Sequence, residues 1–157
     1  MSETHPEFAR IAPDVKLGAR VRLNAFINLY GCTIGDDAMI GTFVEIQRDA
    51  VVGPRCRVQS HTFICSGVTL EADVFVGHGV MFINDRHPTI AATLAGTWKM
   101  ERTVVRRGAS LGSGALIFGG LTIGENAVIG AGAVVLQDVP AGATVAGIPA
   151  RVLKPRA

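Results

Sequence analysis

Histidine is the side chain best suited to take up and release a proton near neutral pH, and the chain contains four: His5, His61, His78 and His87. His61 and His78 form the most informative pair. His61 is the third residue after Val58 and His78 is the second residue after Val76, so both follow an aliphatic residue at nearly the same offset. We expect His61 to act as a general base. The alternative for either histidine is a hydrogen bond that caps a backbone turn.

Polar residues that would assist such a base follow His78 closely. We expect Asp85 or Asn84 to orient His61 or the group that loses its proton, and Asn84 to donate a hydrogen bond to a carbonyl oxygen. His87 is expected on a surface loop and His5 in a terminal segment. The catalytic set expected from the residues is therefore His61, Asn84 and Asp85.

A six-residue interval between aliphatic side chains indicates how these groups are positioned. It is strict in two runs, Ile34, Ile40, Ile46, Val52, Val58, Ile64, Leu70, Val76 and Phe82, then Val105, Leu111, Ile117, Ile123, Ile129 and Val135. An earlier run, Ile11, Leu17, Leu23 and Leu29, loses one residue before Ile34. This period is typical of neither a helix nor a hairpin array, and it is the signature of a parallel β-helix. Three hexads form a coil of about 18 residues, so the sequence predicts roughly six coils with His61 and His78 on one corner of successive coils.

Small residues and glycines occupy fixed places in each hexad. A small or branched residue, such as Ala38 or Ala109, precedes each aliphatic residue by two positions and is expected to face the interior. Glycine often follows the aliphatic residue, as at Gly35 and Gly112, where we expect a turn with positive φ. The prediction is an all-β protein, with one domain over residues 1–157.

The period is interrupted once, over about residues 83–103, a stretch that contains the single tryptophan, Trp98. We expect a loop ejected from the β-helix, and long loops on rigid scaffolds often carry function. The alternatives are a tolerated surface insertion and a cover for an exposed sheet edge.

Composition narrows the function classes. The net charge of +2 provides no basic footprint for nucleic acid, and no run approaches the roughly 20 apolar residues of a membrane helix. The N-terminus lacks a signal pattern, and three cysteines without paired spacing indicate reduced thiols, so we expect a cytoplasmic protein with no nucleic-acid or membrane partner. Cys32 and Cys56 are expected in the core, and Cys65 on an exposed turn.

The hexads and the closing segment 138–152 resemble the hexapeptide-repeat acyltransferases. Segments 58–64, 76–88 and 103–112 are similar to those of the sugar-nucleotide N-acetyltransferases within that group. The resemblance implies a left-handed parallel β-helix, a homotrimer with active sites between subunits, and acetyl-CoA as co-substrate. The implied reaction is acetylation of the 3-amino group of a nucleotide-linked deoxysugar, for polysaccharide biosynthesis. One departure is Phe118-Gly119-Gly120, where relatives more often have Pro-Gly.

The resemblance also implies binding residues. The expected substrate contacts are Glu45, Gln59, His78 and Arg86. The expected coenzyme contacts are Ser113, Ala115, Gly120, Ala131, Ala133, Ile148, Pro149, Arg151 and Lys154. Among these, Arg151 and Lys154 would meet phosphate charge, and Ile148 with Pro149 would offer an apolar surface to adenine.

Three other readings stay open. A γ-type carbonic anhydrase shares the fold and uses three histidine ligands, two of them five residues apart, but Ile83 stands five residues after His78, so we expect no metal. A non-catalytic β-helix subunit would bind no acetyl-CoA. An O-acetyltransferase of a sugar or of serine would need the same base and donors. The sugar is the better of the two acceptors, because serine acetyltransferases normally add an N-terminal helical domain and the hexads here begin by about Ile11.

Overall fold

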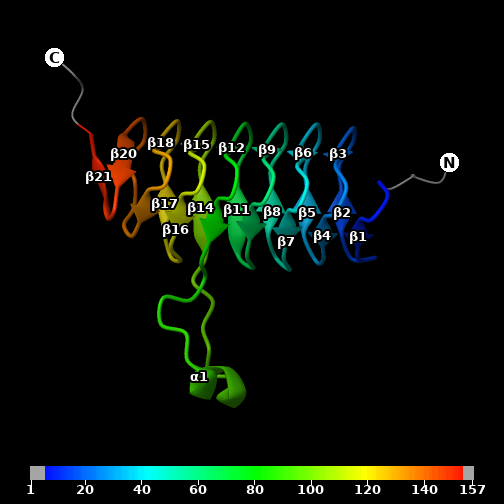
Figure 1. Cartoon of the computed structure of the whole chain (residues 1–157), viewed down its shortest axis with the longest axis horizontal. Helices are drawn as coiled ribbons and strands as arrows, with labels where there is room; N and C mark the ends of the chain where they lie inside the picture. Colours follow the sequence, from blue (N-terminus) through cyan, green and yellow to red (C-terminus); the bar gives the residue numbers. More distant parts are fainter. Residues whose placement is uncertain (1–5, 154–157) are drawn as a thin grey trace.

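The computed structural model describes residues 6–153, which wind into a left-handed parallel β-helix whose coils stack along one axis (Figure 1). Strands of two to four residues alternate with tight turns, and as far as β19 every third strand joins the same sheet. The result is a three-sided prism with six to eight strands on each side, in line with the roughly six coils expected.

The seven-stranded sheet contains β1 (Arg10–Ile11), β4 (Asn28–Leu29), β7 (Glu45–Ile46), β10 (Phe63–Ile64), β13 (Met81–Phe82), β16 (Leu116–Ile117) and β19 (Val134–Val135). The six-stranded sheet contains β2 (Lys16–Leu17), β5 (Thr33–Ile34), β8 (Val51–Val52), β11 (Val68–Leu70), β14 (Thr103–Val105) and β17 (Thr122–Ile123). The eight-stranded sheet contains β3 (Arg22–Leu23), β6 (Met39–Ile40), β9 (Arg57–Val58), β12 (Phe75–Val76), β15 (Ser110–Leu111), β18 (Val128–Ile129), β20 (Thr144–Gly147) and β21 (Ala150–Val152).

The pairing register confirms the repeat. Phe63 pairs with Glu45 in the coil before it and with Met81 in the coil after it, so each pairing advances the chain by three full hexads. The pairing of Asn28 with Glu45 falls short of three full hexads by the residue that is lost before Ile34. Parallel pairing at a constant interval keeps one side chain of each strand pointing inward in every coil.

The interior of the prism is apolar throughout. The inward aliphatic residues from Leu29 to Val135 are essentially fully buried, as are the small residues two positions before them, including Ala38 and Ala109. Each fully buried Val, Leu or Ile contributes about 1.5–3 kcal/mol relative to an exposed one, and successive coils add such residues in register. The core therefore forms a continuous column along the axis.

The glycines that follow the aliphatic residues serve a different purpose from the one expected. Gly35 and Gly112 do not have positive φ. A Cβ at Gly35 would lie 2.7 Å from the Pro54 nitrogen, and one at Gly112 would lie 2.5 Å from the Ala131 nitrogen. Glycine is needed there because the backbone of the next coil passes too close for a side chain.

Positive φ occurs two residues later, as at Asp37 and Gly114, and only some of the residues at this position are glycines. We name the three columns of turns by what they carry. The histidine corner joins the eight-stranded to the seven-stranded sheet (residues 24–27, 41–44, 59–62, 77–80, 112–115 and 130–133). The loop corner joins the seven-stranded to the six-stranded sheet (residues 12–15, 30–32, 47–50, 65–67, 83–102 and 118–121). The charge corner joins the six-stranded to the eight-stranded sheet (residues 18–21, 35–38, 53–56, 71–74, 106–109, 124–127 and 140–143).

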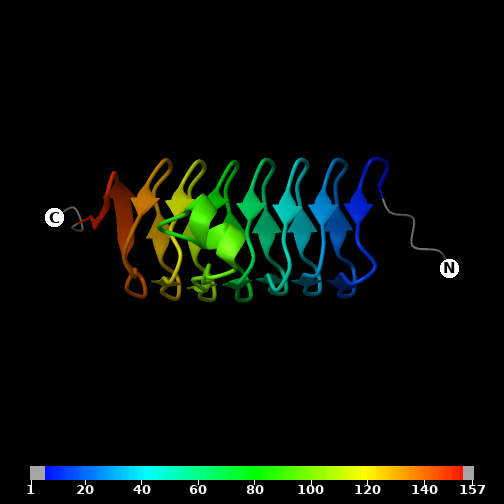
Figure 2. The same ribbon diagram turned by 90° about the horizontal axis from the view of Figure 1, so that it is seen from below.

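The ejected loop leaves the loop corner between β13 and β14 and projects away from the prism (Figure 1). Its tip contains the helix α1 (Ile90–Ala95), which begins after the capping side chain of Thr89 and ends at Gly96 in the left-handed conformation. Seen from below, α1 lies in front of the central coils (Figure 2). Ile90 and Leu94 on this helix are 76% and 83% exposed, so the loop presents apolar surface to its surroundings.

The C-terminal end of the solenoid is closed by a hairpin. Strand β20 continues the parallel ladder on β18, and β21 folds back on β20 in the antiparallel direction. The closing segment therefore caps the last coil. Among residues 6–153 there is no helix with the length and apolar character needed to cross a membrane.

Candidate functional site

A column of aromatic rings runs along the histidine corner and ends at His61. Phe8, Phe26, Phe43 and His61 occupy equivalent turn positions with φ between 57° and 63°. Neighbouring ring centroids lie 5.1, 5.3 and 4.9 Å apart. Sequence reasoning missed the three phenylalanines, although they recur once in each of the first three coils.

Above His61 the same column contains no side chains. The equivalent residues in the next coils are Gly79, Gly114 and Gly132, all with positive φ. A Cβ at Gly79 or Gly132 would have no neighbour within 4 Å, and one at Gly114 would meet only a backbone nitrogen at 4.0 Å. The corner therefore changes from an aromatic ridge to an open strip of glycines, and His61 stands at the boundary.

His78 lies on the same corner, beside this strip. Its Nδ1 is 2.8 Å from the Ser60 Oγ, and its backbone N–H donates to the Ser113 Oγ at 3.1 Å. If Ser60 donates to Nδ1, the other ring nitrogen carries the proton and is a hydrogen-bond donor; in the other tautomer that nitrogen is a base. Both histidines are exposed, and Gln59 begins the turn that contains Ser60 and His61.

Asn84 and Asp85 lie on the loop corner, at the opposite ends of the strands of the seven-stranded sheet from the histidine corner. The Asn84 Nδ2 donates to the Ser66 carbonyl at 3.0 Å, and the Asp85 Oδ1 accepts from the His87 N–H at 2.8 Å. Strand β10 separates His61 from Ser66. Within one chain the strand thus keeps His61 away from the root of the loop, contrary to the expected proximity.

Arg86 is committed to holding the stem of the loop. Its Nε and Nη2 donate to the Gly119 carbonyl at 3.0 and 2.6 Å, and its Nη1 donates to the Leu136 carbonyl at 3.2 Å. The guanidinium also lies 5.9 Å from the Phe118 ring centroid and 3.3 Å from the Glu101 carboxylate. These bonds use all three guanidinium nitrogens, so the expected contact of Arg86 with substrate has no support in this arrangement.

Glu45 is the centre of a polar network on the outer face of the seven-stranded sheet. Its carboxylate accepts hydrogen bonds from Asn28 Nδ2 at 3.2 Å, Tyr30 OH at 3.1 Å and Gln47 Nε2 at 3.0 Å. Partial burial by itself raises the pKa of Glu45, but the three donors outweigh it and hold the pKa below its usual value. Glu45 is therefore a fixed anion that accepts hydrogen bonds, rather than a proton acceptor near pH 7.

The residues expected to bind a coenzyme separate into distinct groups. Ser113 and Ala131 are exposed on the histidine corner beside the glycine strip, whereas Gly120 is exposed on the loop corner. Ala115 and Ala133 are fully buried in the core, so their side chains face away from solvent and any contact with a coenzyme would be made by the backbone.

The remaining expected coenzyme residues belong to the C-terminal hairpin. Ile148 is 77% exposed at its tip, next to Pro149, and Arg151 Nη1 donates to the Ala150 carbonyl at 2.9 Å. Lys154 lies outside the described residues.

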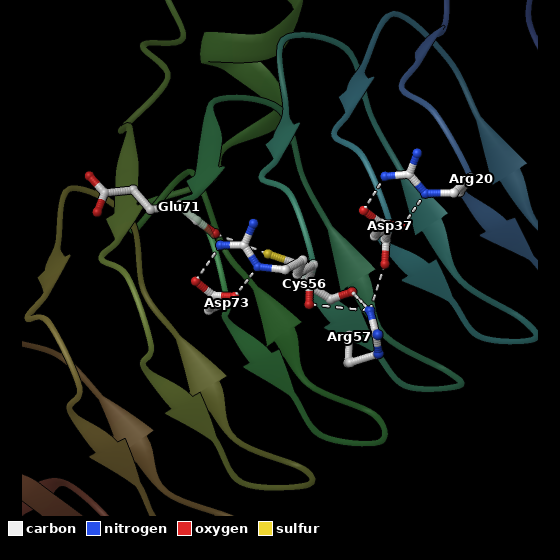
Figure 3. Close-up of polar contacts among 7 residues, drawn as sticks. Arg20, Asp37, Cys56, Arg57, Glu71 and Asp73 are labelled. Carbon is white, nitrogen blue, oxygen red and sulfur yellow. Dashed lines mark hydrogen bonds and ion pairs between the residues drawn. The ribbon is translucent and has the colours of Figure 1, made fainter.

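The charge corner carries ion pairs that link successive coils (Figure 3). Arg20 Nε and Nη2 each donate to the Asp37 carboxylate at 2.7 Å. Arg55 binds Asp73 in the same two-pronged way, at 2.6 and 2.7 Å. All four residues have positive φ and occupy equivalent turn positions, so each pair joins the same position of two successive coils. The charge corner is a different corner from the one that carries His61 and His78.

The three cysteines are buried. Cys32 and Cys56 pack in the core as expected, but Cys65 is also in the core and only 2% exposed, so the expected exposed turn position is wrong. Burial raises the pKa of Cys32 and of Cys65 to about 11. In the described part of the chain, no three His, Cys, Asp or Glu side chains are grouped so that they could hold a metal ion.

Comparison with known proteins agrees with the repeat. Residues 31–66 match the family described as bacterial transferase hexapeptide (six repeats). A serine acetyltransferase of Buchnera aphidicola subsp. Acyrthosiphon pisum is 39% identical over 97 residues, which are 58% of this chain and 35% of the relative. A serine acetyltransferase of Mycobacterium tuberculosis is 35% identical over 120 residues, 71% of this chain and 46% of the relative. The chain thus spans less than half the length of these curated relatives.

Solved structures share the fold over most of the chain. AntD, an N-acyltransferase from Bacillus cereus in complex with dTDP and coenzyme A, superimposes with a TM-score of 0.79 over 90% of this chain and 84% of its own, at 16% identity. A galactoside acetyltransferase in complex with coenzyme A gives a TM-score of 0.68 over 77% of this chain and 63% of its own, at 26% identity.

Proposed function

Because the chain is a left-handed β-helix of hexapeptide repeats, similar to hexapeptide acyltransferases, we propose that it transfers acetyl from acetyl-CoA to the amino group of a nucleotide-linked deoxysugar. The observation that carries the acyl-transfer part is the histidine corner, where His61 ends an aromatic column at the start of an open glycine strip. The amino-sugar part rests on the resemblance of segments 58–64, 76–88 and 103–112.

The chemistry requires a neutral amine, a proton acceptor and donors for the developing oxyanion. The acetyl thioester would lie along the strip of Gly79, Gly114 and Gly132, with its carbonyl next to His61. The amine nitrogen attacks the carbonyl carbon, the C–S bond breaks, and CoA leaves as the thiol. His61 accepts the amine proton and returns it to the departing sulfur, while His78 in its Nε2–H tautomer donates to the oxyanion.

A homotrimer would complete this site. Within one chain His61 lies on the histidine corner and Asn84 on the loop corner, so a neighbour that places its loop corner against the histidine corner would unite them. The exposed Ile90 and Leu94 of the loop provide apolar surface for such a contact. Around a threefold axis every interface is identical, and the trimer would contain three equivalent sites.

A hydroxyl acceptor is the second candidate, because the serine acetyltransferases quoted above are 35–39% identical to this chain over the matched residues. Serine or a sugar hydroxyl would use the same base and donors. The experiment that separates the two is an acetyl-transfer assay with dTDP- and UDP-amino sugars, L-serine and a galactoside as acceptors, with CoA release as the readout. Amino-sugar turnover at least tenfold faster than hydroxyl turnover supports the proposal, and the reverse order contradicts it.

The base assignment is tested with His61→Ala. Loss of a general base lowers kcat by about 10²–10⁴, with little change in acetyl-CoA affinity measured by calorimetry. If both His61→Ala and Asn84→Ala retain near-wild-type rates, the assignment is wrong. A protein that binds no acetyl-CoA at all would instead be a non-catalytic β-helix.

Mixed trimers test whether the site is shared between subunits. The variants His61→Ala and Asn84→Ala are co-refolded in equal amounts and compared with each variant alone. If His61 of one subunit works with Asn84 of its neighbour, about a quarter of the sites regain both wild-type residues. No recovery of activity on mixing, in trimers verified by light scattering, would place both residues in the same chain.

A further inference from the structure

A cavity of about 420 Å³ opens at the N-terminal coils, where the seven-stranded sheet meets the loop corner. It is lined by Arg10, Ala12, Asp14, Asn28, Tyr30 and Arg48. A second cavity of about 520 Å³ lies on the six-stranded side of the same corner and shares Asp14 and Arg48 with the first. The shared residues belong to two turns of the loop corner, 12–15 and 47–50, so the two hollows adjoin each other there.

The cations around this corner are unpaired, unlike those of the charge corner. Among residues 6–153, the side chains of Arg10, Lys16, Arg48 and Arg102 make no hydrogen bond or ion pair, and all four line one of the two cavities. Asp14 and Asp49 are the acids of the same lining, and Asp14 already accepts a hydrogen bond from the Gly31 N–H at 2.9 Å. The excess of cations makes this corner attractive to an anion with more than one charge.

The wall of the first cavity adds groups that recognise hydroxyls. Asn28 and Tyr30 line it, and both bond to the Glu45 carboxylate. Gln47 connects Glu45 to the base of the ejected loop, since its Oε1 accepts from the Ser66 N–H at 3.3 Å and Asn84 donates to the Ser66 carbonyl. An amide, a phenol and an ionised carboxylate held in fixed positions can accept and donate hydrogen bonds to vicinal hydroxyls.

We infer that this corner binds the nucleoside diphosphate part of the acceptor, with its phosphates on Arg10 and Arg48 and its ribose or sugar hydroxyls on Asn28, Tyr30 and Glu45. This inference rests on the proposed function and locates the binding site of the nucleotide part of the acceptor. The guanidinium fork matches phosphate oxygens in two-pronged geometry, which fits arginine rather than lysine at the two central positions. Coenzyme A also carries a diphosphate, so the test must separate the two sources.

The test is calorimetric titration of the wild-type protein and of Arg10→Gln/Arg48→Gln with dTDP, UDP, GDP and, separately, CoA. The matched control is Arg22→Gln, an exposed arginine of β3 in the same N-terminal coil whose side chain makes no hydrogen bond within the described part of the chain. We expect at least one nucleoside diphosphate to bind the wild type. Its Kd should rise about tenfold or more in the double variant, because charge-assisted bonds to phosphate are lost, and change less than twofold in the control.

Each other result overturns the inference. If the double variant binds the nucleoside diphosphate with an unchanged Kd, or if the wild type binds none, the inference is wrong. A Kd that rises for CoA but not for the nucleotides assigns the corner to the coenzyme. Loss of the oligomer without loss of nucleotide binding, seen by light scattering, assigns the arginines to a subunit contact. CoA binding to the wild type tests the proposed function separately, because it does not depend on Arg10 or Arg48.

Discussion

The imidazole of His61 packs on the ring of Phe43, with centroids 4.9 Å apart and ring planes tilted by 42°. No side-chain hydrogen bond fixes His61 within residues 6–153, so this contact is what orients the ring. Packing rather than hydrogen bonding leaves both ring nitrogens available to a substrate. The backbone conformation assists, because the left-handed φ of 63° directs the side chain outward along the column.

Phe43→Ala should therefore lower kcat for acetyl transfer by about two- to tenfold, since a ring-stacking contact is worth roughly 0.5–1.5 kcal/mol. Steady-state kinetics should assign the effect to kcat, with KM for acetyl-CoA within twofold of wild type. Phe26→Ala is the matched control, because Phe26 has the same turn conformation and stacks on Phe43 but makes no ring contact with His61. Equal losses in the two variants would mean that the column acts only on stability.

A ring placed at Gly114 should block the glycine strip. Gly114→Phe puts an aromatic side chain where Phe8, Phe26 and Phe43 already show that this turn accepts one, so the protein should fold. Calorimetry should show acetyl-CoA affinity reduced at least about tenfold, because the ring fills the space for the thioester arm.

Gly142→Phe is the control for that experiment. Gly142 has φ of 69° and open space around its Cβ, but it lies on the charge corner. Its substitution should leave acetyl-CoA affinity unchanged. Unaltered binding in Gly114→Phe, with circular dichroism of a folded β-helix, would rule out this strip as the coenzyme site.

The charge corner should make the fold sensitive to acid. Hydrogen bonds from Arg20 lower the pKa of Asp37, and those from Arg55 lower the pKa of Asp73, below the usual value of 3.8. A depressed folded pKa means that the stabilisation is complete above the unfolded pKa and is lost as pH falls through the folded pKa. The wild-type melting temperature should therefore fall below about pH 4 more steeply than that of Asp37→Asn/Asp73→Asn.

The melting temperatures of the wild type and of Asp37→Asn/Asp73→Asn are measured from pH 7 to pH 2.5 at low salt, where exposed ion pairs are least screened. Near neutral pH the double variant should melt slightly below wild type, and the two curves should converge in acid. Glu125→Gln, which removes a carboxylate without an ion pair among the described residues, should run parallel to wild type. Parallel curves for the double variant would contradict the assignment.

The buried thiols should be nearly inert in the native protein. With the pKa of Cys32 and Cys65 raised from 9.0 to about 11, the thiolate fraction at pH 8 falls about 100-fold, and burial further restricts access. Labelling by a disulfide reagent at pH 8 should be slow in buffer and rapid in denaturant, with three thiols released. Fast labelling of one thiol in folded protein would show that a cysteine reaches the surface.

The fold was predictable because one physical constraint repeats in every coil. Ile40, Val58 and Val76 face the same interior at a fixed interval, and a six-residue period over this length is the signature of a parallel β-helix. The position of His61 and His78 on one corner follows from the same arithmetic. The role of Gly35 did not follow, because close approach of the next coil's backbone is a three-dimensional contact that hexad position alone does not reveal.

The candidate site was less predictable because its members belong to different corners. Asn84 follows His61 by little more than a single coil of the sequence, which suggests proximity, yet the intervening strand β10 spans one full side of the prism. Arg86 resembles a free cation in the sequence, and only the fold reveals the carbonyls of Gly119 and Leu136 that occupy it. These contacts join residues that are separated by 33 and by 50 positions in the sequence, so they leave no local pattern to detect.

The constant spacing between neighbouring strands fixes the distance between groups that lie on different coils. Strands β1, β4, β7 and β10 follow one another in one sheet, so Arg10 and the strand that follows His61 are three strand spacings apart, about 14 Å. Deleting or inserting one coil between them would change that length by about 4.8 Å without altering either end. The number of coils between Arg10 and His61 therefore sets the length of an acceptor that could contact both residues. A related protein with one coil more or fewer at this place would fit an acceptor of a different length.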